Sequence, residues 1–268
     1  MGEAMARLKG KRLWLVIGTG VVVVLVVAVV VTWPLLGRYT GAAAPEQFDR
    51  KVALDPSLKP QYQHVLGVAH NAGNNLKTEA KALRSGAGVI EIDVKSARGQ
   101  LAAGRDQWWP WLAEQVFMGP ALVQAWDEAS PAKVTKLDLK QSSRPFLNDL
   151  VEFLNNRAPS RHVMVATRDA SALMYLHRRL HRVTLLYSVA FPHAVHRLES
   201  DRALEKAIGG VSVFQGLVDP GLVHWVHQHN MQMIAWTVND DPDFNNLVRL
   251  GVDGITTDNL AILKALRR

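Results

Sequence analysis

The chain has 268 residues, 48% of them hydrophobic and 21% charged, which is enough for one large domain and a short additional segment. It contains no cysteine, and this excludes disulfides, thiolate metal sites and cysteine nucleophiles. The formal net charge of +7 suits phosphate groups or an anionic membrane surface and equally an ordinary arginine-rich composition, but no basic run with interleaved aromatic residues indicates nucleic acid.

The first predicted element, residues 13–36, contains no charged residue. A helix of this length can cross a hydrocarbon core of about 30 Å. Trp14 and Trp33 lie near its ends, as interfacial aromatic residues do, and four basic residues precede it against one Glu3. We therefore expect an uncleaved single-pass anchor in the cell membrane, with residues 1–12 cytoplasmic and the remainder extracytoplasmic. A cleaved signal peptide is the alternative, but its apolar region is normally shorter.

A linker over residues 37–60, with Gly, Ala, Pro and mixed charge, is expected to lead into one domain over residues 61–268. Eight short apolar runs in this domain are typical of strands: 64–70, 88–94, 134–140, 162–167, 183–189, 210–216, 232–238 and 254–258. Helical patterns lie between most of them: 74–86, 145–158, 169–181, 219–230 and 241–251.

Expected helix ends support this division of the chain. Asp169, Asp219 and Asp241 are predicted to cap helix N-termini, and Gly86 and Gly251 lie where helices would end. Eight strands that alternate with helices predict an α/β fold, a (β/α)₈ TIM barrel, with a doubly wound open sheet as the alternative. In such a barrel the active-site residues lie at the carboxyl ends of the strands.

Acidic residues interrupt two of the apolar strands. Glu91 and Asp93 share one face of their strand, and Asp138 and Lys140 share one face of the next. If these faces point into the barrel, three carboxylates converge beside one lysine, which is not enough to compensate them. A hard divalent cation, Mg²⁺ or Ca²⁺ (Mn²⁺ would also fit), is the economical answer, whereas a chain without cysteine does not favour zinc. The alternative is that the acids face solvent or cap loops.

Other polar residues follow the strands. His70, at the end of the first strand, is a candidate general acid or base, although a histidine in this position is commonly structural. Lys140 either holds a phosphate oxygen or pairs with the acids. Trp236 and Asn239 lie near the end of the seventh strand, and Asp258 ends the eighth.

The block from 227 to 263, with Trp-Thr-Val-Asn, Gly-Val-Asp-Gly-Ile and Thr-Asp in order, resembles the closing segment of the glycerophosphodiester phosphodiesterase-like superfamily. Together with the His strand, the Glu-x-Asp strand and "KLDLK", the resemblance covers about residues 64–264. The Asp-x-Lys in "KLDLK" is similar to the sphingomyelinase D and menorin-like branches of that superfamily. The resemblance implies Glu91, Asp93 and Asp138 as metal ligands, His70 as the first catalytic histidine, and Lys140, Trp236 and Asn239 in or near the substrate site.

The chain departs from the family pattern at three places. Asn71 replaces the arginine of His-Arg-Gly, residues 73–75 read Gly-Asn-Asn in place of Glu-Asn-Thr, and Arg105 replaces the second histidine, before Asp106. Arginine stays charged and cannot act as a general acid, a role typically worth about 10²–10⁴-fold. Arg105 could stabilise phosphoryl charge, and the chain is then expected to be slow, to need a better leaving group, or only to bind. His193 and His196 are candidates to replace the lost histidine, with exposed loop positions as the competing interpretation.

Two interpretations of the function follow. The first is a membrane-anchored, divalent-metal-dependent phosphodiester hydrolase acting on glycerophosphodiesters or (lyso)phospholipid head groups, with residues 106–111 ("DQWWPW") as a lip for acyl chains or membrane or as a loop packed on the barrel. The second is a catalytically degenerate barrel that binds a phosphate-bearing lipid or partner. An aldolase using Lys140 as a Schiff base is disfavoured because adjacent acids keep its amine protonated.

Overall fold

The computed structural model describes residues 47–97, 99–109, 114–117 and 119–267. The predicted cytoplasmic tail and membrane anchor, residues 1–12 and 13–36, lie outside these residues. Within the described ranges, no helix is both long and apolar enough to cross a membrane.

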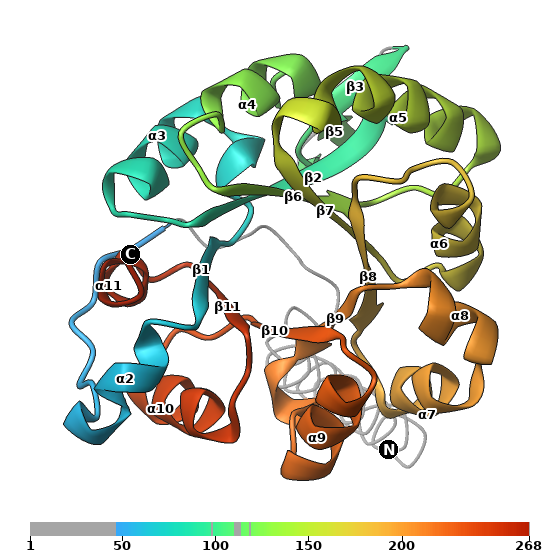
Figure 1. Cartoon of the computed structure of the whole chain (residues 1–268). Helices are drawn as coiled ribbons and strands as arrows, with labels where there is room; N and C mark the ends of the chain where they lie inside the picture. The colour runs from blue at the N-terminus through green and yellow to red at the C-terminus, as the bar shows by residue number, and fades with distance from the viewer. Residues whose placement is uncertain (1–46, 98, 110–113, 118, 268) are drawn as a thin grey trace, which may run out of the picture. The chain divides into compact units, whose positions relative to one another are not determined.

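All eight predicted strands are confirmed. They are β1 Leu66–Ala69, β2 Val89–Ala97, β6 Val134–Leu139, β7 His162–Thr167, β8 Thr184–Val189, β9 Gly210–Phe214, β10 Gln232–Trp236 and β11 Gly254–Thr257. Each pairs in parallel with its neighbours in the order β1, β11, β10, β9, β8, β7, β6, β2, and β1 also pairs with β2 (Figure 1). This last pairing closes the sheet, so the fold is the expected α/β TIM barrel and the open-sheet alternative is wrong.

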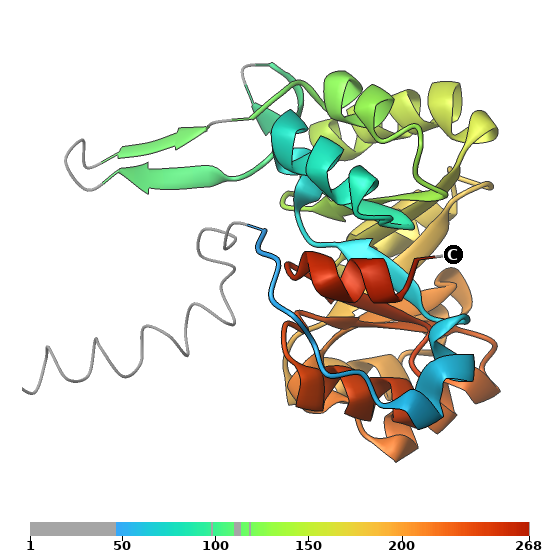
Figure 2. The same cartoon turned by 90° about the vertical axis from the view of Figure 1, so that its left-hand side faces the viewer.

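Three further strands follow β2. β3, Gln100–Ala103, pairs with β2 in antiparallel orientation. β4, Asp106–Trp109, and β5, Glu114–Phe117, form a separate two-stranded antiparallel sheet that extends away from the barrel (Figure 2). The predicted lip therefore begins as a strand and not as a loop packed on the barrel, while its residues 110–111 lie outside the described part of the chain.

Helices surround the barrel sheet (Figure 1). The α-helices are α2 Lys59–Tyr62, α3 Leu76–Arg84, α4 Leu122–Glu128, α5 Arg144–Arg157, α6 Ala170–His177, α7 Pro192–Ser200, α8 Arg202–Ala207, α9 Pro220–Gln228, α10 Asp241–Leu250 and α11 Leu260–Ala265. Short 3₁₀ turns are η1 Pro56–Leu58, η2 Ala72–Asn74, η3 Ala158–Ser160 and η4 Gln215–Leu217.

The helix caps are mostly as expected. Asp169 and Asp219 accept hydrogen bonds from the first-turn amides of α6 and α9, and Gly251 ends α10 at a left-handed φ of 88°, which favours glycine. The prediction for Asp241 is wrong by one position. Asp240 is the N-cap, because it has the extended backbone and accepts from the Asp243 amide, while Asp241 is already helical.

The segment before the barrel packs against its last helices. Phe48 bridges to Asn259 beside β11, and the Ala53 amide donates to the Asp241 carboxylate at 2.8 Å. Leu58 is buried in the core. Residues 47–60 of the predicted linker are thus held to the surface of the barrel unit.

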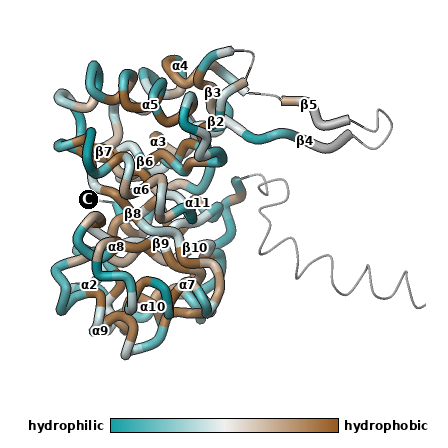
Figure 3. The backbone as a smooth tube through the Cα atoms, turned by 90° about the vertical axis from the view of Figure 1, so that its right-hand side faces the viewer, coloured by the Kyte–Doolittle hydropathy of each residue, from teal (hydrophilic) through white to brown (hydrophobic). Residues whose placement is uncertain are grey.

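The core has two parts. A large apolar layer lies between the sheet and the helices, and Figure 3 shows hydrophobic residues along the strands and recurring on the helices. A small apolar layer fills the barrel interior: Val68, Val89, Met164, Ala166, Leu186 and Ile234. One further step along the strands, the interior becomes polar, with Glu91, Lys136 and Ser212. Because side chains alternate along a strand, every second residue after these also faces the interior and lies nearer the carboxyl end, or mouth, of the barrel.

Candidate active site

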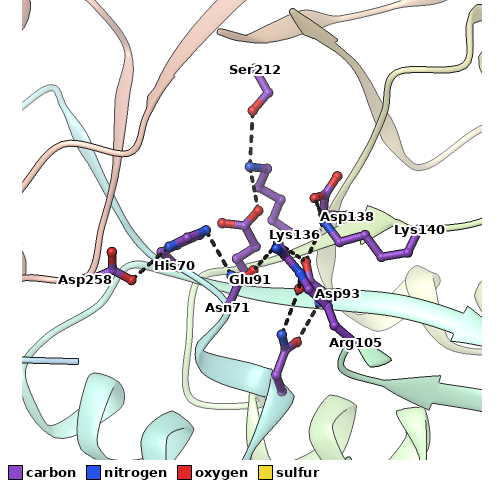
Figure 4. Close-up of polar contacts among 11 residues, drawn as sticks. His70, Asn71, Glu91, Asp93, Arg105, Lys136, Asp138, Lys140, Ser212 and Asp258 are labelled. Carbon is purple, nitrogen blue, oxygen red and sulfur yellow. Dashed lines mark hydrogen bonds and ion pairs between the residues drawn. The ribbon is translucent and has the colours of Figure 1, made fainter. Parts of the chain in front are cut away.

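The three predicted metal ligands converge at the mouth of the barrel. Asp93 of β2 stands opposite Asp138 of β6 in the parallel register, and Glu91 lies two residues earlier on β2. Glu91, Asp93 and Asp138 each present an oxygen, and the three oxygens lie within 4.8 Å of one another (Figure 4). The alternative that these acids merely cap loops or face solvent is wrong for Glu91 and Asp93, which are buried.

Asp93 is fully buried and both of its carboxylate oxygens accept hydrogen bonds. Lys140 Nζ lies 2.9 Å from Oδ1, and Asn74 Nδ2 donates to Oδ2 at 2.8 Å. Arg105 reaches both oxygens, through Nε to Oδ2 and through Nη2 to Oδ1. Burial raises the pKa of Asp93, but Lys140 and Arg105 together hold that pKa well below its usual range. Asp93 is therefore an anion at any physiological pH.

Glu91 belongs to a buried polar layer one step deeper in the barrel. Lys136 Nζ donates to Glu91 Oε1 at 3.1 Å and to Ser212 Oγ at 3.3 Å. Glu91 Oε2 is buried and has no hydrogen-bond partner among the described residues. Lys136 was not among the predicted site residues, although a signal was present, since Lys136, Asp138 and Lys140 occupy every second position and so share one face.

The charge balance of the site corrects the sequence-based argument. Lys140 was predicted as the one nearby cation, yet Arg105 and Lys136 also contact the carboxylates. Lys140 pairs with both Asp138 and Asp93. Burial lowers its pKa, but these two acids raise the pKa above its ordinary value overall, so the amine is charged. Three acids thus face three bases, and charge alone does not demand a metal ion. A Schiff-base role for Lys140 stays disfavoured.

His70 is held in one orientation at the end of β1. Its Nδ1 lies 2.8 Å from Asp258 Oδ1, and its Nε2 lies 2.9 Å from Asn71 Nδ2. The Asn71 oxygen accepts from Arg105 Nη2 at 3.3 Å, so the Asn71 amide nitrogen faces the histidine. Nε2 must then be an acceptor, and Nδ1 carries the proton donated to Asp258. This hydrogen-bond arrangement is that of the neutral tautomer with its lone pair on Nε2.

The pKa of His70 reflects opposing influences. Burial, the largest single effect, lowers the pKa, but the hydrogen bond and charge of Asp258, with the charge of Glu91, raise it above the ordinary value of 6.5. Asn71 itself adopts a left-handed backbone at φ 51°, a conformation that asparagine tolerates well. Asn71, one of the departures from the family pattern, thus joins Arg105 to His70.

The remaining predicted site residues lie on two sides of the mouth. Asn239 donates to Asp258 Oδ2 at 2.9 Å and accepts from the Asp258 amide and the Thr257 hydroxyl. It therefore orients Asp258, and its contact with substrate stays a prediction. Trp236 is half-buried at the end of β10, with its ring 5.6 Å from that of Phe214.

His193 and His196 do not join the acidic cluster. Both are exposed on α7, and His193 stacks on Phe191 with ring centroids 5.5 Å apart. Among the described contacts, neither bonds to His70, Arg105 or a carboxylate of the site. They are exposed, as the competing interpretation expected, but they lie on a helix and not in a loop.

Comparisons with known proteins point to one family. The model of the glycerophosphoryl diester phosphodiesterase family matches residues 123–262, whereas no curated protein sequence matches the chain. The fold is similar to a glycerophosphodiester phosphodiesterase from Parabacteroides distasonis, at 20% identity and TM-score 0.60, covering 76% of this chain and 97% of that one.

Two other solved structures share the fold. A phosphodiesterase from Oleispira antarctica, in complex with the product sn-glycerol-3-phosphate, has 18% identity and TM-score 0.62, covering 77% of this chain and 98% of that one. A calcium-dependent phosphoinositol-specific phospholipase C from a Pseudomonas species has 12% identity and TM-score 0.55, covering 78% of this chain and 94% of that one.

Proposed function

The chain belongs to the glycerophosphoryl diester phosphodiesterase family of phosphoric diester hydrolases, and we propose that it cleaves glycerophosphodiesters or (lyso)phospholipid head groups at the barrel mouth. The convergence of Glu91, Asp93 and Asp138, with ligand oxygens within 4.8 Å of one another, carries this proposal. The relative from Oleispira antarctica was solved with sn-glycerol-3-phosphate, its product, which supports the same substrate class.

The same three carboxylates would hold one divalent cation, Mg²⁺ or Ca²⁺. They offer only hard oxygen ligands, which these ions prefer, and the buried Glu91 Oε2 has no partner among the described residues. The related phospholipase C is calcium-dependent. When bound, such an ion would neutralise charge on the phosphoryl oxygens and on the leaving oxygen. Asp93 would have to exchange one of its present contacts, to Arg105 or Lys140, for the ion.

The side chains of the site have distinct tasks in this proposal. His70 Nε2 carries the lone pair, and it would take a proton from the attacking water, or attack phosphorus, once substrate displaces the Asn71 amide. Asp258 accepts the Nδ1 hydrogen and so stabilises the imidazolium that results. Lys140 and Arg105 are charged and lie on the same carboxylate, so both can attract a phosphoryl oxygen.

A second candidate function rests on Arg105. It occupies the position where the family resemblance implies the second histidine, and it forms a two-pronged contact with Asp93. A guanidinium does not give up its proton, so Arg105 cannot protonate a leaving alcohol. A barrel that binds a phosphate-bearing lipid or partner without turnover is the function that this observation favours.

Membrane anchoring is part of the proposal. Residues 13–36 are uncharged and basic residues precede them, which supports a single-pass anchor with the barrel on the extracytoplasmic side. Extraction of cell membranes at alkaline pH should leave the full chain in the pellet, and external protease should digest the barrel domain in spheroplasts. Release into the supernatant contradicts the anchor.

Kinship with the sphingomyelinase D and menorin-like branches rests on Asp138 and Lys140 alone.

The activity is tested on the purified full chain in detergent. Release of free alcohol from glycerophosphocholine, glycerophosphoinositol and lysophosphatidylcholine is measured with Mg²⁺, with Ca²⁺ and with a chelator. We expect metal-dependent turnover that is lost in His70→Ala and in Asp93→Asn but retained in His196→Ala, an exposed histidine outside the cluster. Binding of metal and ligand by calorimetry without turnover of any substrate contradicts the hydrolase and supports the binding function.

A further inference from the structure

The mouth of the barrel has a second half that the acidic cluster does not use. Arg168 directly follows β7, Phe191 lies two residues beyond β8, and Phe214 and Trp236 end β9 and β10. These four strands are consecutive neighbours in the sheet (Figure 1). They complete the ring whose other strands, β11, β1, β2 and β6, carry the charged site residues. We call these four residues the aromatic rim.

One ring pair and two cation–π contacts link the members of the aromatic rim. The rings of Phe214 and Trp236 lie 5.6 Å apart at an interplanar angle of 60°. The Arg168 guanidinium carbon lies 5.9 Å from the centroid of the Trp236 ring and 6.0 Å from that of Phe191. Arg168 is exposed and the three rings are half-buried. One guanidinium therefore lies within cation–π range of two rings of the rim.

Strand parity directs this group toward the mouth. The residues two positions before Arg168, Phe214 and Trp236 all point into the barrel interior: Ala166, Ser212 and Ile234. Because side chains alternate along a strand, Arg168, Phe214 and Trp236 continue the same inward face at the carboxyl end. Phe191 lies beyond β8 as the N-cap residue of α7, and parity does not place it. Ala166 also pairs in register with Asp138, so Arg168 lies on the strand next to the acidic cluster.

A phosphodiester bound at the acidic cluster has two ester arms, and one of them must cross the aromatic rim or leave the barrel. Aromatic faces alone would suit a quaternary ammonium group. Here Arg168 carries the same sign of charge and lies over two of those rings, so it repels a cationic head group. A guanidinium favours carboxylate or phosphate through charge-assisted hydrogen bonds.

We propose that the aromatic rim is a head-group subsite for an arm that carries a second anionic group, such as a phosphomonoester, and that Arg168 determines this specificity. The proposal rests on the proposed function, because the arm must belong to a phosphodiester held at the acidic cluster. Phe214 and Trp236 would contact the carbon skeleton of the arm while Arg168 binds its charge.

The test uses the full chain and three probes with different arms: glycerophosphoinositol 4-phosphate, glycerophosphoinositol and glycerophosphocholine. We expect kcat/KM for the phosphorylated inositol to exceed that for the unphosphorylated one by about tenfold or more, since a hydrogen bond to a charged group has that worth. Arg168→Ala and Arg168→Gln should bring this ratio close to one. Arg179→Ala is the matched control, because Arg179 is an exposed arginine over Tyr175, at 3.7 Å, on the outer helices.

Binding of the same probes by calorimetry separates the two proposals. A preference for the phosphorylated arm that Arg168→Ala removes, without turnover, overturns the hydrolase function and retains the subsite. Turnover in which wild type does not prefer the phosphorylated arm, or in which the Arg168 variants keep that preference, overturns the subsite and retains the hydrolase. Neither binding nor turnover of any probe overturns both.

Discussion

Replacement of Lys136 by methionine tests the buried polar layer beneath the site. Lys136 is 2% exposed and Glu91 is 4% exposed. Lys136 Nζ donates a hydrogen bond to Glu91 Oε1 at 3.1 Å. Glu91 Oε2 already lacks a partner among the described residues. Removal of one member of a buried ion pair typically costs about 3–5 kcal/mol, because the other charge is left uncompensated. At about 2–4 °C per kcal/mol for a domain of this size, the Tm should fall by about 6–20 °C.

The assay is thermal unfolding of the full chain, followed by circular dichroism at pH 7. The double variant Lys136→Met/Glu91→Gln removes both charges and should recover much of the lost stability. Added Mg²⁺ or Ca²⁺ should raise the Tm of Lys136→Met more than that of wild type, because the ion takes the place of the lost ammonium beside Glu91. A Tm within about 3 °C of wild type, or a double variant as unstable as the single one, would refute the reasoning.

Three further predictions concern residues around the site and the outer layer. Arg105→His restores a proton donor beside Asp93 and should raise kcat by about 10²-fold in steady-state assays, whereas an unchanged rate means that protonation is not limiting. Asp258 raises the pKa of His70 against the effect of burial, so that pKa should fall in Asp258→Asn. The acid limb of the kcat/KM–pH profile should then move to lower pH while the maximum rate drops. An acid limb that does not move contradicts the role of His70 as base. Glu79 has a pKa raised to about 8, chiefly by burial and then by the charge of Glu128. The folded state therefore holds this proton more tightly than the unfolded state, and the free energy of unfolding falls by up to about 1.4 kcal/mol per pH unit between the ordinary pKa of 4.5 and pH 8. Glu79→Gln should flatten that slope in urea titrations.

The barrel strands were predictable because each is a short run of apolar residues bounded by turn-forming residues. β7, His162–Thr167, matches its predicted range at both ends, since all but its first residue are buried. Helices α4 and α7 were missed for a local reason. α4 has only seven residues, and both helices follow a residue, Ala121 or Phe191, that lacks the polar oxygen of a usual N-cap.

The site was predictable where strand parity determined it and unpredictable where distant residues meet. Glu91, Asp93 and Asp138 converge because alternation and parallel register align them. Lys136 pairs with Glu91 in that same register, so their contact followed from the same alternation and was overlooked. Asn71 was interpreted as the loss of a family arginine, yet it accepts a hydrogen bond from Arg105, 34 residues away. No local pattern encodes such a contact, since loop geometry brings the two side chains together.

The most direct test of the acidic cluster as a phosphodiesterase site is a phosphorus-31 NMR time course of glycerophosphoinositol with the full chain and Mg²⁺ or Ca²⁺. We predict that wild type converts the diester resonance into that of a phosphomonoester or a cyclic diester, which also distinguishes hydrolysis from cyclising transfer. Asp138→Asn should leave the diester resonance unchanged over the same period, while Asn148→Ala, a variant on helix α5, should behave as wild type. Equal conversion by wild type and Asp138→Asn would contradict the assignment of the chemistry to these carboxylates.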